Sequence, residues 1–154
     1  MKKAVLVRRI AARPAIVFNA LVTAEGMGSW WGPDDQPVLS TAADTRVGGD
    51  FRIRFRTSDG LEHECIGQFL EIEEPHRIAM SYQWASGGVS EEGNEQVSRL
   101  EFHLRPIDTG TELTLVHSAL RNEASARSHE RGWGRALEKL MRVLANKSQG
   151  GVAS

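Results

Sequence analysis

A long amphipathic helix near the end of the sequence limits the architectures open to this chain. Its apolar side chains recur at intervals of four, three and four residues, at Trp133, Leu137, Leu140 and Leu144. A helix over about residues 124–146 would be about 34 Å long, which is comparable to the width of a small domain. Its apolar face must therefore be covered by another large element.

The preceding sequence predicts an antiparallel sheet. Apolar and polar residues alternate strictly over residues 51–56, and similar strand patterns cover 3–10, 78–84, 100–104 and 113–117. Pro14 opens a short helical pattern and a second helical segment follows over 24–31. One face of the sheet needs a cover, and only the final helix is long enough to provide it. We predict an α+β fold in which a curved antiparallel sheet of about seven strands wraps around the C-terminal helix, with two short helices after the first strand.

The turn after residue 56 sets which side chains face each other in the first hairpin. A three-residue loop over 59–61 would place Phe55 opposite Cys65, whereas a two-residue loop would place Phe55 opposite Glu64. We favour the three-residue loop because it separates apolar from charged faces. Apolar residues after Phe69 then fall out of phase, which predicts a β-bulge there.

Composition excludes several classes of protein. The 154 residues carry 19 basic and 20 acidic side chains, and the net charge of −1 favours neither nucleic acid nor an anionic membrane surface as a partner. Cys65 is the only cysteine, so no internal disulfide forms, which is typical of a cytoplasmic protein. The five histidines lack the spacing of a zinc site, and no nucleotide-binding motif or membrane-spanning run is present. We expect no cofactor, no metal, no nucleic-acid binding and no membrane insertion.

Two polar residues fall on apolar strand faces. His117 alternates with Leu113 and Leu115, and Tyr82 lies between Met80 and Trp84 in the same way. Both side chains could line one pocket, where they could orient a carbonyl group or act as general acid and base. The simpler interpretation, which we prefer, is a buried histidine that hydrogen-bonds within the protein.

Six motifs in a fixed order resemble those of a known family. They are Arg13-Pro14-Ala15-x-Val17-Phe18, Trp30-Trp31-Gly32-Pro33, Arg46-Val47-Gly48-Gly49, Gly67 through Pro75-x-Arg77, Gly110 through His117, and His129-x-x-Gly132-Trp133. Over nearly its whole length the chain resembles the bacterial branch of the activator of heat-shock-protein-90 ATPase homologue-like family, in the START-related SRPBCC superfamily. The resemblance implies a helix-grip fold with an apolar cavity between sheet and helix.

The cavity leads to a functional prediction. We expect residues 1–149 to form one START-like domain that binds a hydrophobic or amphipathic small molecule, lipid-, sterol- or polyketide-like, and residues 150–154 to form a flexible tail. The expected ligand-binding residues are Trp30, Trp31, Phe51, Ile53, Phe55, Phe69, Met80, Tyr82, Trp84, Leu115, His117, Trp133, Leu137 and Met141. Trp30 and Trp31 are placed near the mouth.

Three alternatives to simple ligand binding stay open. The first is an enzyme, similar to a polyketide cyclase, dehydratase or hydrolase, that uses His117 and Tyr82. The second is a stress-related chaperone partner, and the third is a homodimer through the outer face of the sheet. Because no residue pattern identifies a catalytic group, we predict a binding protein rather than an enzyme, and we assign no catalytic residue.

Overall fold

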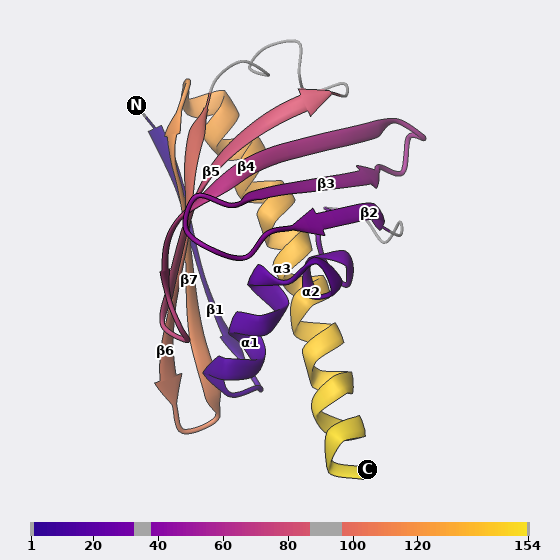
Figure 1. Cartoon of the computed structure of the whole chain (residues 1–154), viewed down its shortest axis with the longest axis vertical. Coiled ribbons are helices and arrows are strands. Elements are labelled where there is room, and N and C mark those ends of the chain that lie inside the picture. Colours follow the sequence, from indigo (N-terminus) through magenta and orange to yellow (C-terminus); the bar gives the residue numbers. More distant parts are fainter. Residues whose placement is uncertain (1, 33–37, 87–96, 154) are drawn as a thin grey trace.

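The computed structural model describes residues 2–32, 38–86 and 97–153 (Figure 1). In chain order the elements are β1 (Lys2–Ile10), α1 (Pro14–Val22), α2 (Ala24–Gly28), β2 (Val38–Ala43), β3 (Asp50–Arg56), β4 (Glu62–Glu73), β5 (Arg77–Ser86), β6 (Ser98–Ile107), β7 (Gly110–Leu120) and α3 (Glu123–Ala153). None of the described helices is long and apolar enough to cross a membrane.

The strands form one antiparallel sheet with the order β1-β7-β6-β5-β4-β3-β2. The sheet curves, and α3 runs across its concave side with α1 and α2 beside it (Figure 1). Strand order follows chain order except that β1 joins the far edge by pairing with β7. This architecture confirms the predicted α+β helix-grip fold, including the two short helices after the first strand.

The predicted register of the first hairpin is wrong by two residues. Phe55 pairs with His63, and Ile53 pairs with Cys65. The loop residues are 58–60. The Thr57 N–H donates to the Leu61 carbonyl and the Gly60 N–H donates to the Thr57 carbonyl, both at 2.9 Å, and Gly60 takes a φ of 87°. A three-residue loop places its glycine at the left-handed position, so Gly60 determines the loop. A shift of two residues keeps each side chain on its predicted face.

Other local predictions had mixed outcomes. The bulge is confirmed, because the pairing of β4 with β5 shifts between Phe69 and Glu71. The edge strand β2 was not predicted, because its sequence, VLSTAA, shows no clear alternation.

The Asn122 side chain accepts a hydrogen bond from the Ser125 backbone N–H at 2.8 Å, which caps α3. The helix continues to Ala153, past its predicted end and into the segment expected to be a tail.

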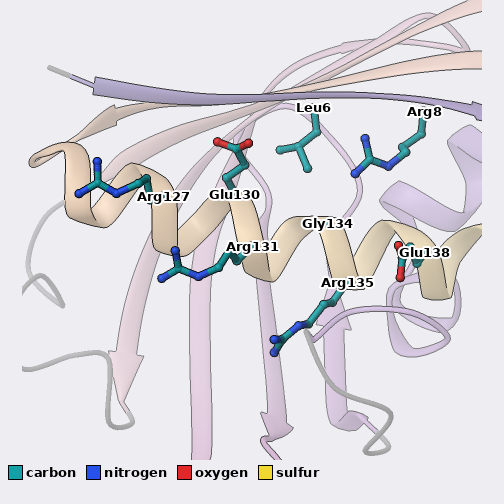
Figure 2. Close-up of a pocket in the computed structure, with 8 residues that line it drawn as sticks. All are labelled: Leu6, Arg8, Arg127, Glu130, Arg131, Gly134, Arg135 and Glu138. Carbon is teal, nitrogen blue, oxygen red and sulfur yellow. The ribbon is translucent and has the colours of Figure 1, made fainter.

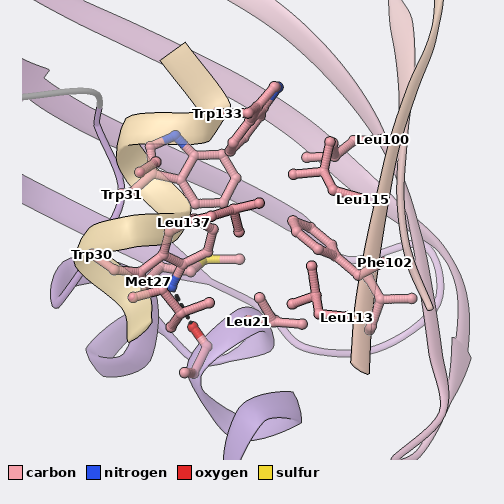
Figure 3. Close-up of a cluster of buried hydrophobic side chains, with 14 of the residues drawn as sticks. Leu21, Met27, Trp30, Trp31, Leu100, Phe102, Leu113, Leu115, Trp133 and Leu137 are labelled. Carbon is pink, nitrogen blue, oxygen red and sulfur yellow. Dashed lines mark hydrogen bonds between the residues drawn. The ribbon is translucent and has the colours of Figure 1, made fainter. Parts of the chain in front are cut away.

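The core lies between the sheet and the helices. Figure 3 shows side chains from α1, α2, the strands β6 and β7, and α3 packed together there. The four residues that defined the amphipathic helix, Trp133, Leu137, Leu140 and Leu144, are all buried. Gly26 permits the close contact of α2 with α1, because a Cβ atom on it would lie 2.6 Å from the Ala20 Cα. Each large core side chain stabilises the fold by about 1.5–3 kcal/mol through apolar burial.

Candidate functional site

Six aromatic rings from four parts of the chain meet between the sheet and α3. We define them as the aromatic cluster: Trp31, which follows α2, Tyr82 and Trp84 on β5, His117 on β7, and His129 and Trp133 on α3. Tyr82 and Trp84 are two residues apart and therefore lie on one face of β5. His129 and Trp133 are four residues apart and therefore lie on one face of α3.

The rings of the aromatic cluster are in direct contact. The His117 ring centroid is 4.6 Å from that of His129 and 4.8 Å from that of Tyr82, both edge to face. Trp31 contacts Trp133 at 5.2 Å between ring centroids. Such distances are those of favourable aromatic packing. The expected pocket residues of this group therefore do lie together, and they pack against one another.

His117 lies at the centre of the aromatic cluster and is completely buried. Its Nδ1 accepts a hydrogen bond from the Trp133 indole N–H at 3.0 Å, so the ring proton must be on Nε2. Nε2 then donates to the Ser98 hydroxyl at 2.7 Å, and that hydroxyl donates to the Tyr82 carbonyl at 3.1 Å. Burial, with a smaller contribution from His129, holds the pKa of His117 well below its ordinary value of 6.5. The imidazole is therefore neutral, and both of its nitrogens are used within the protein.

His129 also accepts a hydrogen bond from a tryptophan and donates one, but the roles of its two ring nitrogens are exchanged relative to those of His117. Its Nδ1 donates to the Ser125 carbonyl at 2.8 Å, which leaves Nε2 to accept the Trp84 indole N–H at 3.3 Å. Burial lowers the pKa of His129, and the Ser125 hydrogen bond only partly opposes this. On α3, the imidazole of His129 accepts a hydrogen bond from Trp84 of β5, and the indole of Trp133 donates one to His117 of β7. Two tryptophan–histidine hydrogen bonds join the helix to the sheet.

Tyr82 meets Cys65 on the neighbouring strand β4. Burial raises the pKa of the Cys65 thiol to about 12, although hydrogen bonds from the Tyr82 hydroxyl and the Trp31 indole favour the thiolate. Burial also raises the pKa of Tyr82 well above 10, with Cys65 adding to the effect. Both groups are therefore neutral at physiological pH. A neutral, completely buried thiol is a weak nucleophile.

The aromatic cluster reaches the surface at one end. Trp84 and His129 are half-buried, whereas the other four members are at most 5% exposed. Trp31 is only 2% exposed and Trp30 is fully buried, with its indole N–H donating to the Ala20 carbonyl at 2.8 Å. The two residues expected near the mouth are therefore in the interior, and the Trp84–His129 pair is at the surface instead.

The remaining predicted ligand-binding residues belong to the same contiguous core. Those that are buried are Phe51, Ile53, Phe55, Phe69, Met80, Leu115 and Leu137, while Met141 is half-buried and packs against them. Their role in ligand binding stays a prediction. Among the residues that the structure describes, no group of three or more histidine, cysteine or acidic side chains is placed to hold a metal ion.

Two residues of the site were not among the predicted ligand-binding residues. His129 was named only as part of the last family motif, although it precedes Trp133 by four residues and so shares its helix face. Ser98 begins β6 and has no distinguishing sequence pattern. Its position opposite His117 depends on how β6 pairs with β7.

Comparison with known proteins identifies the family. The family model for "Activator of Hsp90 ATPase homolog 1-like protein" matches residues 11–145. The chain belongs to this family. Its fold is shared with the AHSA1 protein from Silicibacter pomeroyi, with a TM-score of 0.82 and 24% identity over 95% of this chain and 99% of that chain. A protein from Chromobacterium violaceum gives a TM-score of 0.79 at 21% identity, covering 93% of this chain and 97% of its own.

A solution structure extends this similarity. The AHSA1-like protein from Aeromonas hydrophila has a TM-score of 0.75 and 19% identity, over 96% of this chain and 94% of that one. None of the curated proteins matches the sequence. At these identities the structural neighbours establish the fold alone, while the family match confirms the predicted family resemblance.

Proposed function

We propose that this protein binds a neutral hydrophobic or amphipathic small molecule, lipid-, sterol- or polyketide-like, between the sheet and α3. The observation that carries the proposal is the aromatic cluster, a continuous set of ring faces that is buried at one end and reaches solvent at Trp84 and His129. Ligand sites are typically lined by apolar and aromatic side chains with a few polar groups that set orientation.

The polar groups at the half-buried end suit a hydroxyl-bearing ligand. The hydrogen bond from Trp84 to His129 is 3.3 Å long, compared with 3.0 Å for that from Trp133 to His117. A ligand hydroxyl inserted between the first pair would accept from the Trp84 indole and donate to His129 Nε2. It would therefore replace the hydrogen bond that it breaks. An ionised ligand is disfavoured, because a neutral imidazole in a largely apolar site does not offset a buried charge.

We expect His129, rather than His117, to orient the ligand. Both nitrogens of His117 are engaged by Trp133 and Ser98, and a ligand could use them only after breaking an internal hydrogen bond. The same engagement disfavours His117 as a general base for an enzymatic reaction. Binding without chemical conversion is therefore the function that we propose.

Native mass spectrometry and tryptophan fluorescence titration test the proposal. A panel of fatty acids, sterols and aromatic polyketides should contain at least one class that binds in a 1:1 ratio and changes the emission. The variants Trp84→Phe and His129→Leu should weaken binding of hydroxyl-bearing members by about tenfold, the loss expected for one or two buried hydrogen bonds. The exposed His76 provides the matched control, and His76→Leu should bind as the unaltered protein does.

Two outcomes of these experiments would contradict the proposal. If no class of compound binds above background, the aromatic cluster is only a packed core. If binding survives unchanged in both Trp84→Phe and His129→Leu, the ligand does not enter at the half-buried end.

A further inference from the structure

Strand β1 lies at one edge of the sheet. It pairs with β7 on one side, and no strand within residues 2–32, 38–86 or 97–153 pairs with its other side (Figure 1). An open strand edge presents backbone N–H and C=O groups that another extended segment can bind. This feature is independent of the proposed function, because Trp84 lies on β5, three strands away from β1.

The register of the sheet shows which peptide groups of β1 lie on its open side. Ile107 and Gly110 close the two-residue turn between β6 and β7, so the peptide groups of Gly110 and of every second residue after it are directed towards β6. Pro106, which has no N–H, lies opposite Thr111 and fits this alternation. The intervening residues of β7 are directed towards the even-numbered residues of β1. The residues that direct their N–H and C=O groups to the open side are therefore Val5, Val7 and Arg9.

The open edge also carries exposed apolar side chains. Val5 is 44% and Val7 49% exposed, and they alternate with the buried residues of β1 that face α3. Val116 of β7 lies opposite Val5, so an apolar strip continues from β7 to the edge. The Val7 carbonyl accepts a hydrogen bond from the Arg8 Nη1 at 2.9 Å, which the N–H of an added strand would replace. Because an exposed apolar edge strand tends to pair with another chain, we expect this edge to bind a partner.

The charges of β1 determine which partner fits. Its sequence, KKAVLVRRI, has two basic residues on each side of the valines and no acidic residue. A second copy of the chain is disfavoured, because antiparallel pairing that aligns the valines places Lys3 directly opposite the second copy's Arg9. Arg9 is 78% exposed and its Nε lies 4.0 Å from a Glu112 carboxylate oxygen, an ion pair that contributes little. Lys3 has no carboxylate partner in the described part of the chain. Both cations are therefore able to meet acidic residues of a partner.

The inner side of the edge sets a second requirement. Figure 2 shows Leu6 and Arg8 pointing from β1 towards α3, with the Glu130 carboxylate between the two elements. A groove of about 510 Å³ lies between β1 and α3 here, and Gly134 adds no side chain to it. The inward side chains of an added strand would lie along this groove. Small uncharged side chains fit there, whereas Glu130 would repel an acidic one.

From these observations we infer that the β1 edge binds an extended peptide whose outward residues are, in order, acidic, β-branched, β-branched and acidic. The peptide pairs antiparallel with β1, so that its acidic residues lie opposite Lys3 and Arg9 and its β-branched residues lie opposite Val5 and Val7. Each central β-branched residue exchanges two backbone hydrogen bonds with the valine opposite it. The residues between the outward ones are small and uncharged, and they face α3.

The peptide Glu-Thr-Val-Thr-Val-Thr-Glu, acetylated and amidated at its ends, is the probe that tests this inference. In ¹H–¹⁵N NMR titrations the Val5 and Val7 amide signals should shift and saturate, with a Kd on the order of 1 mM or tighter. The amide signals of Leu6 and Arg8 should shift less, because their N–H groups are directed towards β7. The peptide should also slow the hydrogen exchange of the Val5 and Val7 amides.

N-methylated peptides separate backbone pairing from electrostatic attraction. Methylation of both valine nitrogens removes the two N–H donors directed to β1 and should weaken binding by about tenfold or more. Methylation of the first and last threonine nitrogens, which point away from β1, should change the affinity by less than about twofold.

Protein variants test the role of charge. Lys3→Gln and Arg9→Gln should each weaken binding by about threefold, the effect expected for one exposed ion pair. Arg52→Gln is the matched control, because it removes the same charge from an exposed position on β3, five strands away from β1. Its effect should stay below about 1.5-fold.

The inference is wrong if the acidic peptide does not saturate, if both N-methylated peptides bind equally, or if Arg52→Gln weakens binding as much as Arg9→Gln. It is also wrong if Lys-Thr-Val-Thr-Val-Thr-Lys binds as tightly as the acidic peptide, because the basic residues of β1 would then play no part. A protein that is dimeric in light scattering, with Val5 and Val7 amides already protected from exchange, would show that a second copy occupies this edge instead.

Discussion

Acidification should destabilise this protein through the two histidines of the aromatic cluster. Burial lowers the pKa of both His117 and His129 below the ordinary value of 6.5. Below pH 6.5 the unfolded chain binds more protons at these two positions than the folded chain does. The free energy of unfolding must therefore fall as the pH falls through this range.

The magnitude follows from proton linkage. A histidine that stays neutral in the folded protein lowers the free energy of unfolding by about 1.4 kcal/mol between about pH 8 and pH 5.5. His117, which is completely buried, should give nearly all of this value, and the half-buried His129 a part of it. We expect a total loss of about 1.4–2.8 kcal/mol. Carboxylates with lowered pKa values, such as Glu71 and Glu101, lose their stabilising effect only as the pH falls below 4.5.

Urea unfolding followed by circular dichroism at several pH values measures this loss. His117→Gln removes the more deeply buried titrating group, so its free energy of unfolding should depend on pH about half as strongly or less. His76→Gln changes an exposed histidine and should keep the dependence of the unaltered protein. A free energy of unfolding that is constant from about pH 8 to 5.5, or a His117→Gln variant with an unchanged slope, would refute the reasoning.

Three further predictions concern packing and reactivity. Gly26→Ala should destabilise the fold by about 1–3 kcal/mol because its new methyl group meets the α1 backbone, whereas Gly28→Ala has space and should not lower the thermal midpoint. Trp133→Phe removes the donor to His117 Nδ1 and should cost about 1–3 kcal/mol in urea unfolding; an unchanged midpoint would contradict the hydrogen bond. Cys65 should react with a thiol reagent only as fast as the protein unfolds, and rapid labelling of the folded protein would be inconsistent with its burial.

Much of the fold was accessible from local sequence patterns. The alternation over 51–56 and the helical spacing after Trp133 each report directly which side chains are buried, and both elements are present, although α3 extends past its predicted end. The hairpin register failed because one backbone conformation, the positive φ of Gly60, decided where the loop closed. The edge strand β2 carries little periodicity because it is only partly buried.

The candidate site was less predictable because it depends on tertiary geometry. Alternation placed His117 on the inner face, but the identity of its partners depends on where α3 crosses the sheet. The contact of Trp84 with His129 joins residues 45 positions apart. Similarly, Arg8 approaches Gly134 only because β1 pairs with β7 at the sheet edge next to α3. No local pattern encodes such contacts.

The four tryptophan indole N–H groups provide the most direct test of ligand binding between sheet and helix. They have four different acceptors, namely the Ala20 carbonyl for Trp30, Cys65 for Trp31, His129 for Trp84 and His117 for Trp133. Each should give a separate signal in a ¹H–¹⁵N NMR spectrum. On titration with a hydroxyl-bearing apolar ligand, the Trp84 signal should shift most and saturate, and the Trp30 signal should shift least. A panel that leaves the Trp84 signal unmoved, or that moves Trp30 alone, would contradict ligand binding at this site.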